Sequence, residues 1–202
     1  MEVFRRCKER FFYKNSKTIR QRVEEKICGG KQKVNSFTIK HITGNVLDSD
    51  APIIAHQVNC QGVMGAGVAK CIREKYPDIM TDYVRWCQNY DENYLLGLIQ
   101  LYRINENEDK FIANCFAQSK KARYGRLTNY EAFYNSMISL VHAVDHYHLE
   151  PRIAFPYKIG CGIGGGDWNI ILAIIKSVFS QFDDFTIEFW SLDEFGVIPV
   201  VC

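Results

Sequence analysis

The sequence lacks any apolar stretch long enough to cross a bilayer, and its first residues carry charges where a secretory leader would be apolar. It also lacks the Gly-Lys-Ser/Thr triplet of a Walker A loop. These absences exclude an integral membrane protein and the common phosphate-binding loop of ATPases. We expect a cytoplasmic protein without a membrane partner.

The eight cysteines form no C-x-x-C pair and follow no zinc-binding spacing. His142 and His146 would share one face of a helix, but no third metal ligand is apparent beside them. We therefore expect reduced thiols, no metal site and no cofactor.

The net charge of +2 hides an asymmetry between the two ends of the chain. Residues 1–35 hold 11 Lys and Arg and 4 Asp and Glu, a net charge of +7. The rest of the chain holds 14 Lys and Arg and 19 Asp and Glu, a net charge of −5. Within this basic segment Ile19, Val23 and Ile27 recur every four residues. We predict a helical N-terminal extension over 1–36, which packs on the acidic body or meets nucleic acid, and a compact domain over 37–202.

A loop with five glycines follows the apolar run that ends at Phe155, and a helical pattern of apolar residues begins directly after it. Free N–H groups at the start of a helix, with the positive end of its dipole behind them, attract anions. We interpret this second glycine loop (residues 156–167) as a diphosphate cradle. The alternative is a long turn in which Asp167 only caps the following helix.

A first glycine loop (residues 59–69) follows the nearly continuous apolar run 53–58, which is typical of a strand buried on both faces. Further strands are expected at 37–42, 95–104, 111–117 and 185–190, and Thr128 and Glu131 should form a capping box that opens a helix. Strands that alternate with helices predict an α/β/α sandwich around a mixed sheet. Ligands of such folds bind at the carboxyl ends of the strands.

Three motifs together resemble the macrodomain, an ADP-ribose-binding fold: Gly44-Asn-Val46, Asn59-Cys-x-x-x-Met-Gly-Ala-Gly-Val-Ala69 and Pro156-x-x-Ile-Gly-Cys-Gly-Ile163…Trp168. They cover roughly residues 37–192 and are more specific together than either glycine loop alone. The similarity is greatest to the branch that contains the terminal ADP-ribose protein glycohydrolase and the ADP-ribose 1″-phosphate processing proteins. The resemblance implies a three-layer α/β/α domain that binds ADP-ribose or an ADP-ribosylated protein.

The resemblance also implies a ligand site. Asn45 and Val46 would meet the adenine, with Asn45 where many macrodomains have an aspartate that accepts a bond from the adenine amino group. The first glycine loop would surround the distal ribose, and the second would wrap the diphosphate. The residues implied are Asn59, Met64, Gly65, Ala66, Gly67 and Val68 in the first loop, and Gly160, Cys161, Gly162, Ile163, Gly164 and Gly165 in the second.

For catalysis, the glycohydrolase uses a lysine that attacks the distal ribose and an aspartate in the second glycine loop. Lys120 falls near the place of the lysine, whereas Gly164 occupies the place of the aspartate and Asp167 is the nearest carboxylate. In the alternative route, a water oriented by Asn59 and activated by Asp167 or by a substrate phosphate attacks C1″. The thiol of Cys161 lies among the cradle amides, and the resemblance treats it as structural.

These motifs predict a hydrolase that removes ADP-ribose from an acyl linkage of the glutamate type, or a related linkage, at the distal ribose. Two alternatives remain: an ADP-ribose 1″-phosphate phosphatase, and a reader module that binds ADP-ribose without chemistry. DNA-linked ADP-ribose is a further possible substrate, with nucleic acid held by the basic N-terminal extension.

Overall fold

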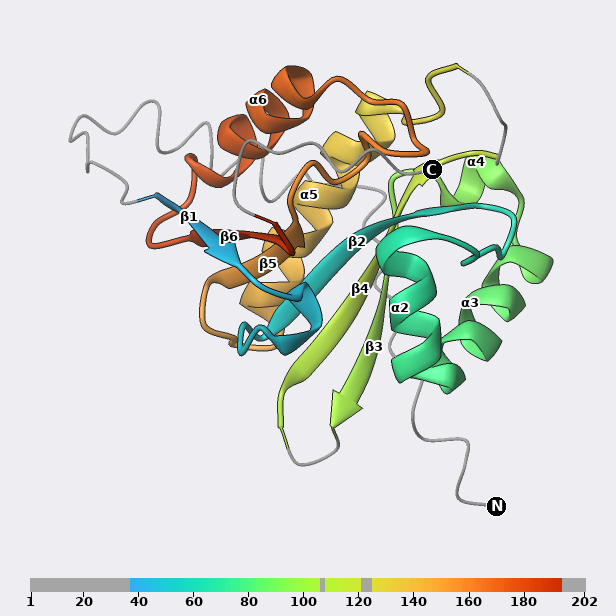
Figure 1. Cartoon of the computed structure of the whole chain (residues 1–202), viewed down its shortest axis with the longest axis horizontal. Helices are drawn as coiled ribbons and strands as arrows, with labels where there is room; N and C mark the ends of the chain where they lie inside the picture. Colours follow the sequence, from blue (N-terminus) through green and yellow to red (C-terminus); the bar gives the residue numbers. More distant parts are fainter. Residues whose placement is uncertain (1–36, 106–107, 121–124, 194–202) are drawn as a thin grey trace.

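The computed structural model describes residues 37–105, 108–120 and 125–193, and these form a three-layer α/β/α domain (Figure 1). The predicted N-terminal extension, its boundary at residue 36 and its proposed nucleic-acid contact lie outside the described residues. None of the helices in the described ranges is long and apolar enough to span a membrane.

A six-stranded mixed sheet forms the middle layer, in the order β1-β6-β5-β2-β4-β3. Every neighbouring pair is parallel except β3 and β4, which are antiparallel. The short link between those two strands allows only a hairpin, because a parallel pair needs a longer crossover. The strands are β1 (Thr38–Thr43), β2 (Ile53–Asn59), β3 (Ile99–Asn105), β4 (Lys110–Gln118), β5 (Arg152–Pro156) and β6 (Thr186–Ser191).

Helices cover both faces of this sheet (Figure 1). One face packs on α5 (Tyr130–His146) and α6 (Trp168–Phe179) in the larger apolar core. The other face packs on η2 (Val46–Asp48), α2 (Gly67–Lys75) and α3 (Pro77–Asn89) in two smaller cores. Along β2, Ile53 belongs to the first core and Ile54 to a core on the opposite face, which explains its unbroken apolar run.

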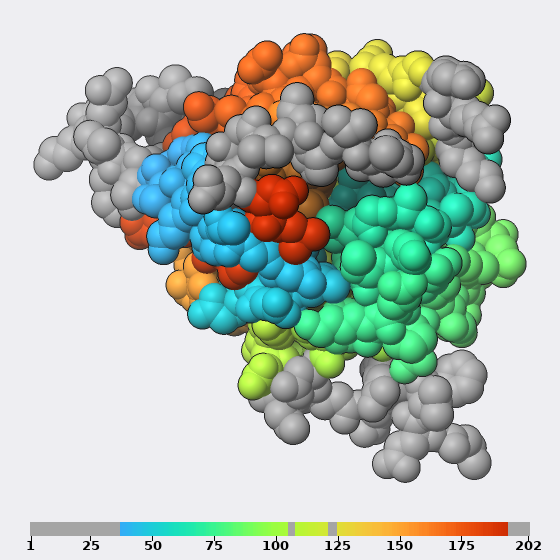
Figure 2. Space-filling model, viewed as in Figure 1, coloured from blue at the N-terminus to red at the C-terminus, as the bar shows by residue number. Residues whose placement is uncertain are grey.

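The parallel strands β5, β2 and β4 lie side by side, so their carboxyl ends meet at one edge of the sheet. Both glycine loops leave from this edge, the first after Asn59 and the second after Pro156. Figure 2 shows the orange residues of α6 and the teal residues around α2 as separate parts of the same face of the molecule. The sheet therefore places two loops, distant in sequence, on either side of one space.

Two expected details differ in the structure. The strand expected from residue 95 begins only at Ile99, because α4 (Glu92–Leu95) precedes it, with Asp91 as its N-cap. The capping box expected from Thr128 is wrong: the N-cap of α5 is Asn129, whose side chain accepts a hydrogen bond from the amide of Ala132. The hydroxyl of Thr128 is bonded elsewhere.

Candidate functional site: a cavity lined by main-chain amides

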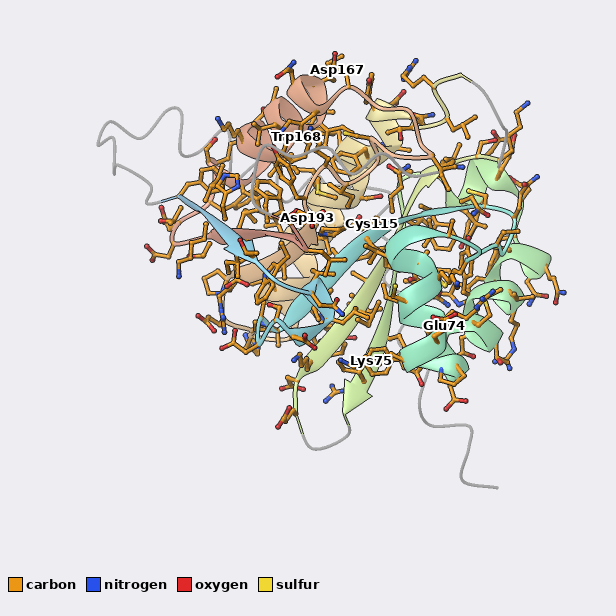
Figure 3. All side chains as sticks on the ribbon, in the orientation of Figure 1. Glu74, Lys75, Cys115, Asp167, Trp168 and Asp193 are labelled. Carbon is orange, nitrogen blue, oxygen red and sulfur yellow. The ribbon has the colours of Figure 1, made fainter. Side chains whose placement is uncertain are left out.

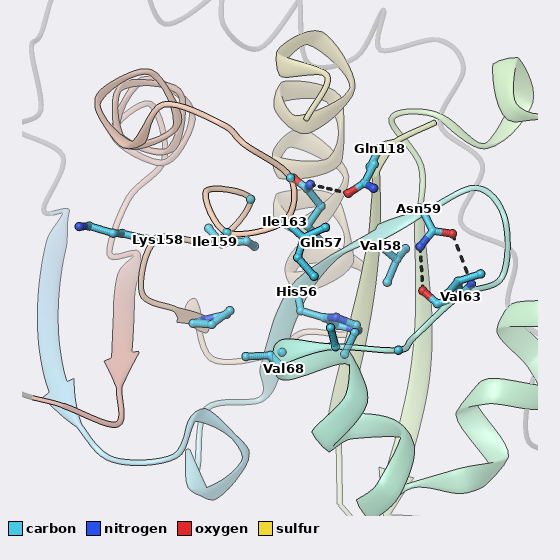
Figure 4. A pocket seen from close by; sticks show the side chains of 18 of the residues that line it. His56, Gln57, Val58, Asn59, Val63, Val68, Gln118, Lys158, Ile159 and Ile163 are labelled. Atoms are coloured by element: carbon cyan, nitrogen blue, oxygen red, sulfur yellow. Dashed lines mark hydrogen bonds between the residues drawn. The ribbon is translucent and has the colours of Figure 1, made fainter. Parts of the chain in front are cut away.

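A cavity of about 660 Å³ lies at the carboxyl edge of the sheet (Figure 4). Its wall comes from the end of β2, from the start of α2 with the residues before it, from Gln118 at the end of β4, and from the second glycine loop. The two glycine loops thus share one groove, as the sequence predicts. Its lining residues are His56, Gln57, Val58, Asn59, Val63, Gly65–Ala69, Gln118, Pro156–Gly160 and Gly162–Gly164.

The second glycine loop presents free main-chain N–H groups to this cavity. The loop is closed by its own bonds, in which the amides of Cys161, Gly165 and Gly166 donate to carbonyl oxygens within the loop at 2.9–3.0 Å. The consecutive amides of Gly162–Gly164 have no hydrogen-bond partner among the described residues, and all three residues line the cavity. Successive free N–H groups of this kind form an anion-binding nest.

The structure narrows the set of loop residues whose amides face the cavity. Cys161 and Gly165 were expected to bind the ligand with their neighbours, but their amides close the loop and neither residue lines the cavity. Gly160 lines the cavity and adopts a φ of +75°, which a residue with a Cβ rarely adopts. The nest therefore comprises residues 162–164 and depends on the turn at Gly160.

Gly164 is a glycine because no other residue fits there. A Cβ at this position would lie 2.5 Å from the carbonyl oxygen of Gly160 and 2.5 Å from Oγ1 of Thr128. The resemblance aligns Gly164 with the catalytic aspartate of the glycohydrolase. The packing behind the loop thus gives a physical reason for the absence of that aspartate from this chain.

The start of α2 supplies a second set of free amides. Its N-cap is Ala66, which has no side chain to accept a bond from the first turn, and the first intrahelical bond runs from Lys70 to Ala66. Residues 67–69 of this turn line the cavity. The positive end of the helix dipole and these N–H groups face the same space as the nest, so the cavity attracts anions from two directions.

Asn59 lies at the end of β2 and lines the cavity, but its side chain also holds the first glycine loop in shape (Figure 4). Its Nδ2 donates to the carbonyl oxygen of Val63 at 2.7 Å, and its Oδ1 accepts from the amides of Gln61 at 2.9 Å and Val63 at 3.3 Å. An amide group has two N–H donors, so one remains for a ligand. Contact with the distal ribose stays a prediction.

Three other expected ligand residues lie outside the cavity wall. Met64 is 1% exposed and packs in the core beside α3. Asn45 caps η2, where its Oδ1 accepts from the amide of Leu47 at 3.0 Å, and Val46 is buried. The structure thus gives these residues structural partners, and the predicted adenine contact is not part of the cavity wall.

The two expected catalytic side chains also lie outside the cavity wall. Asp167 is the N-cap of α6, accepting from the amide of Asn169 at 2.7 Å, and Figure 3 shows it at the outer end of that helix. Lys120 is exposed, and its carbonyl oxygen accepts from Nε2 of Gln118 at 2.7 Å. The structure places Lys120 two residues after the cavity residue Gln118, and Asp167 at a helix terminus.

Burial raises the pKa of the Cys161 thiol to about 11, and this outweighs the opposing effect of the nearby Lys158. The thiol is therefore protonated near neutral pH. A protonated thiol is a poor nucleophile, which agrees with a structural role for Cys161.

The sequence analysis missed the polar residues His56, Gln57, Gln118, Tyr157 and Lys158 of the wall, and the first two lie side by side on β2. His56 is 2% exposed, its Nε2 lies 2.6 Å from Oδ1 of Asn114, and burial lowers its pKa to about 4. Gln57 points to the opposite face of the strand and bonds to Thr128. The available signal was two adjacent polar residues in an otherwise apolar strand, just before a glycine loop.

Together, a parallel sheet edge and two glycine loops with free amides define a nucleotide-phosphate-binding α/β domain. The Macro domain family model matches residues 55–175, and the chain belongs to this family. The match spans both glycine loops and the helices and strands between them.

Comparison with known proteins gives relatives of several kinds. The chain is 29% identical over 147 residues to an uncharacterised 17.5 kDa protein of Enterobacteria phage T4, which covers 72% of this chain and 92% of the phage protein. It is 25% identical over 149 residues to the DNA ADP-ribosyl glycohydrolase of Mycobacterium tuberculosis, covering 72% of this chain and 40% of that enzyme. It is 39% identical over 83 residues to an ADP-ribose 1″-phosphate phosphatase of Saccharomyces cerevisiae, covering 40% of this chain and 46% of that enzyme. The chain thus spans less than half the length of either enzyme.

Solved structures share the fold. The macrodomain of Mycobacterium tuberculosis DarG matches with a TM-score of 0.66 and 24% identity, over 77% of this chain and 98% of that one. Thermosipho africanus DarTG in complex with ADP-ribose matches with a TM-score of 0.65 and 19% identity, over 80% of this chain and 43% of that one. These likenesses establish the macrodomain fold.

Proposed function

We propose that this macrodomain binds ADP-ribose and hydrolyses a bond at C1″ of its distal ribose. One observation carries the proposal: two sets of free main-chain amides, at residues 162–164 and 67–69, line a single cavity. Main-chain amides bind a diphosphate without a metal ion or a charged side chain. The names of the enzymes among the relatives support hydrolysis.

The diphosphate fits between the two sets of amides. Gly162–Gly164 would bind it from the α6 side, and the first turn of α2 would bind it from the other side of the sheet. The carboxyl end of β2, with Asn59 and Gln118 nearby, then receives the distal ribose. In this proposed arrangement C1″ would lie close to the segment that carries Lys120, just after β4.

The chemistry at C1″ depends on the linkage. None of the cavity-lining residues described is acidic, and a Cβ at Gly164 has no space. In the lysine-adduct route an aspartate assists the reaction. This chain has no carboxylate at the position that the resemblance gives to that aspartate, which is Gly164. A water oriented by Asn59 and activated by a phosphate of the substrate needs no carboxylate in the wall.

A cavity wall without an acidic residue among the described ones favours the ADP-ribose 1″-phosphate phosphatase, in which the substrate brings its own phosphate to the reacting atom. The 39% identity to the yeast phosphatase supports the same choice. An acyl linkage of the glutamate type, or a link to DNA, remains in the proposal as the substrate of the related glycohydrolase reaction.

Calorimetric titration with ADP-ribose tests binding, and a panel of ADP-ribose 1″-phosphate, glutamate-linked and DNA-linked substrates tests hydrolysis. We expect a saturable ADP-ribose isotherm and turnover of at least the 1″-phosphate. Binding without turnover of any substrate would make the chain a reader module. The absence of ADP-ribose binding would overturn the proposal.

Lys120→Ala separates the two chemical routes. In the adduct route, turnover falls by orders of magnitude while ADP-ribose affinity is kept, because the lysine acts only in the reaction. In the phosphate-assisted route, both turnover and affinity remain. Lys176→Ala on α6, a lysine outside the cavity wall, is the matched control.

A further inference from the structure

The carbonyl groups of the second glycine loop are held on the side away from its nest. The oxygen of Gly160 accepts from Oγ1 of Thr128 at 2.8 Å and from the amide of Gly166 at 2.9 Å. The oxygen of Gly164 accepts from the amides of Leu127 and Thr128 at 2.8 and 2.9 Å. These bonds fix two peptide planes, the one that follows Gly160 and the one that follows Gly164. The three planes between them carry the free N–H groups.

Thr128 contacts both ends of the nest, since its hydroxyl binds Gly160 and its main chain binds Gly164. It is 1% exposed and does not line the cavity. A Cβ at Gly164 would lie 2.5 Å from its Oγ1, so loop and side chain are packed tightly together. Thr128 therefore acts on a ligand only through the loop.

Gln57 sets the direction of the Thr128 hydroxyl. Nε2 of Gln57 donates to Oγ1 of Thr128 at 2.9 Å, so the hydroxyl accepts this bond and donates its own proton to Gly160. A Cβ at Gly160 would lie 2.7 Å from Oε1 of Gln57, which shows that this amide packs directly against the loop. The buried hydroxyl thus has a partner on each side.

The sheet anchors Thr128 itself. Thr128 forms an isolated β-bridge with Gln118 at the end of β4, and the amide of the following residue, Asn129, donates to the carbonyl oxygen of Ala117 at 2.8 Å. A long glycine-rich loop has a large entropy of its own, and ordering it opposes binding. A fixed point on the sheet reduces that loss.

We propose that Thr128, oriented by Gln57, is a positioning residue that holds the second glycine loop in the form that binds a nucleoside diphosphate. The inference relies on the proposed function only for the identity of the ligand. No contact between Thr128 and the substrate is involved.

Thr128→Val tests it, because valine keeps the shape of threonine and removes the hydroxyl. We expect the Kd for ADP-ribose and for ADP to rise about tenfold, because the amides must be ordered again on binding. Adenosine, which lacks phosphates, should bind with unchanged affinity in an NMR titration. Thr128→Ser retains the hydroxyl and should stay within about twofold of the wild type.

Ser136→Ala is the matched control. Ser136 is fully buried on α5, and its hydroxyl donates to the carbonyl oxygen of Leu98 at 3.2 Å, away from the cavity. It should lower Tm as a lost buried hydrogen bond does, without a change in Kd. Equal Kd values for ADP in Thr128→Val and Ser136→Ala would overturn the inference.

Amide hydrogen exchange decides the question without a ligand. The amide of Gly166 donates to the same oxygen as Thr128, so Thr128→Val should speed its exchange about tenfold or more, and Ser136→Ala should not. Unchanged exchange at Gly166 would refute the positioning role even if the wild type failed to bind ADP-ribose. Faster exchange without any ADP-ribose binding would refute the proposed function alone.

Discussion

A Cβ at Gly164 would lie 2.5 Å from Oγ1 of Thr128, although the two residues belong to separate segments that meet only in the folded domain. The same Cβ would lie 2.8 Å from Nε2 of Gln57. Three segments therefore converge behind the nest, and the amides in front of it depend on this packing.

Gly164→Ala should displace the loop. Overpacking of this kind costs about 1–3 kcal/mol of stability, and we expect the Kd for ADP-ribose to rise about tenfold or more. Gly162→Ala is the control for stability only, because a Cβ there meets nothing within 4 Å and its φ is not in the strained range, whereas the residue itself lines the cavity. Thermal unfolding and calorimetry measure both effects. Similar stability of the two variants would contradict the close packing behind Gly164.

Ala66→Asp should change stability and binding in opposite directions. An aspartate at the N-cap of α2 accepts a bond from the free first turn, which stabilises a helix by about 1 kcal/mol. The added charge occupies these amides and repels the diphosphate, so ADP-ribose affinity should fall. Ala66→Asn provides a cap without the charge and should weaken binding less. An unchanged Kd in Ala66→Asp would show that α2 does not bind the phosphates.

The buried His56 should make stability depend on pH. Burial lowers its pKa to about 4, below the ordinary value of 6.5. As the pH falls, the histidine of the unfolded chain is therefore protonated before that of the folded chain. The contribution of neutral His56 to the free energy of unfolding is full above pH 6.5. It falls by roughly 3 kcal/mol as the pH falls towards 4. His56→Gln should flatten the urea-unfolding profile between these values relative to the wild type. Parallel profiles of the two proteins would contradict a buried neutral histidine.

Asp167→Ala should lower stability by about 1 kcal/mol through loss of the α6 cap. Asp167→Asn keeps an oxygen that accepts the bond and should retain most of that stability. Because Asp167 lies outside the cavity wall, we expect turnover of both variants to stay within about threefold of the wild type. A large fall in the turnover of Asp167→Asn at normal Tm would instead give this carboxylate a catalytic role.

Much of the fold follows from local pattern. The unbroken apolar run of β2 indicates a strand buried on both faces, and the structure confirms it, with Ile53 and Ile54 in cores on opposite sides of the sheet. The position of the α5 cap did not follow, because Thr128 and Asn129 both suit an N-cap. Tertiary contacts chose between them, since the hydroxyl of Thr128 is taken by Gly160.

The sequence by itself determined the alternation of strands and helices and the two glycine loops, because these depend on short-range periodicity and on the freedom of glycine. Only the tertiary structure decided which amides of those loops are free. Cys161 and Gly165 lie in the same glycine run as Gly162–Gly164, yet their N–H groups close the loop while the other three face the cavity. Thr128 and Gln57 pack against the carbonyl side of this loop from segments distant in sequence, and no local pattern encodes such long-range contacts.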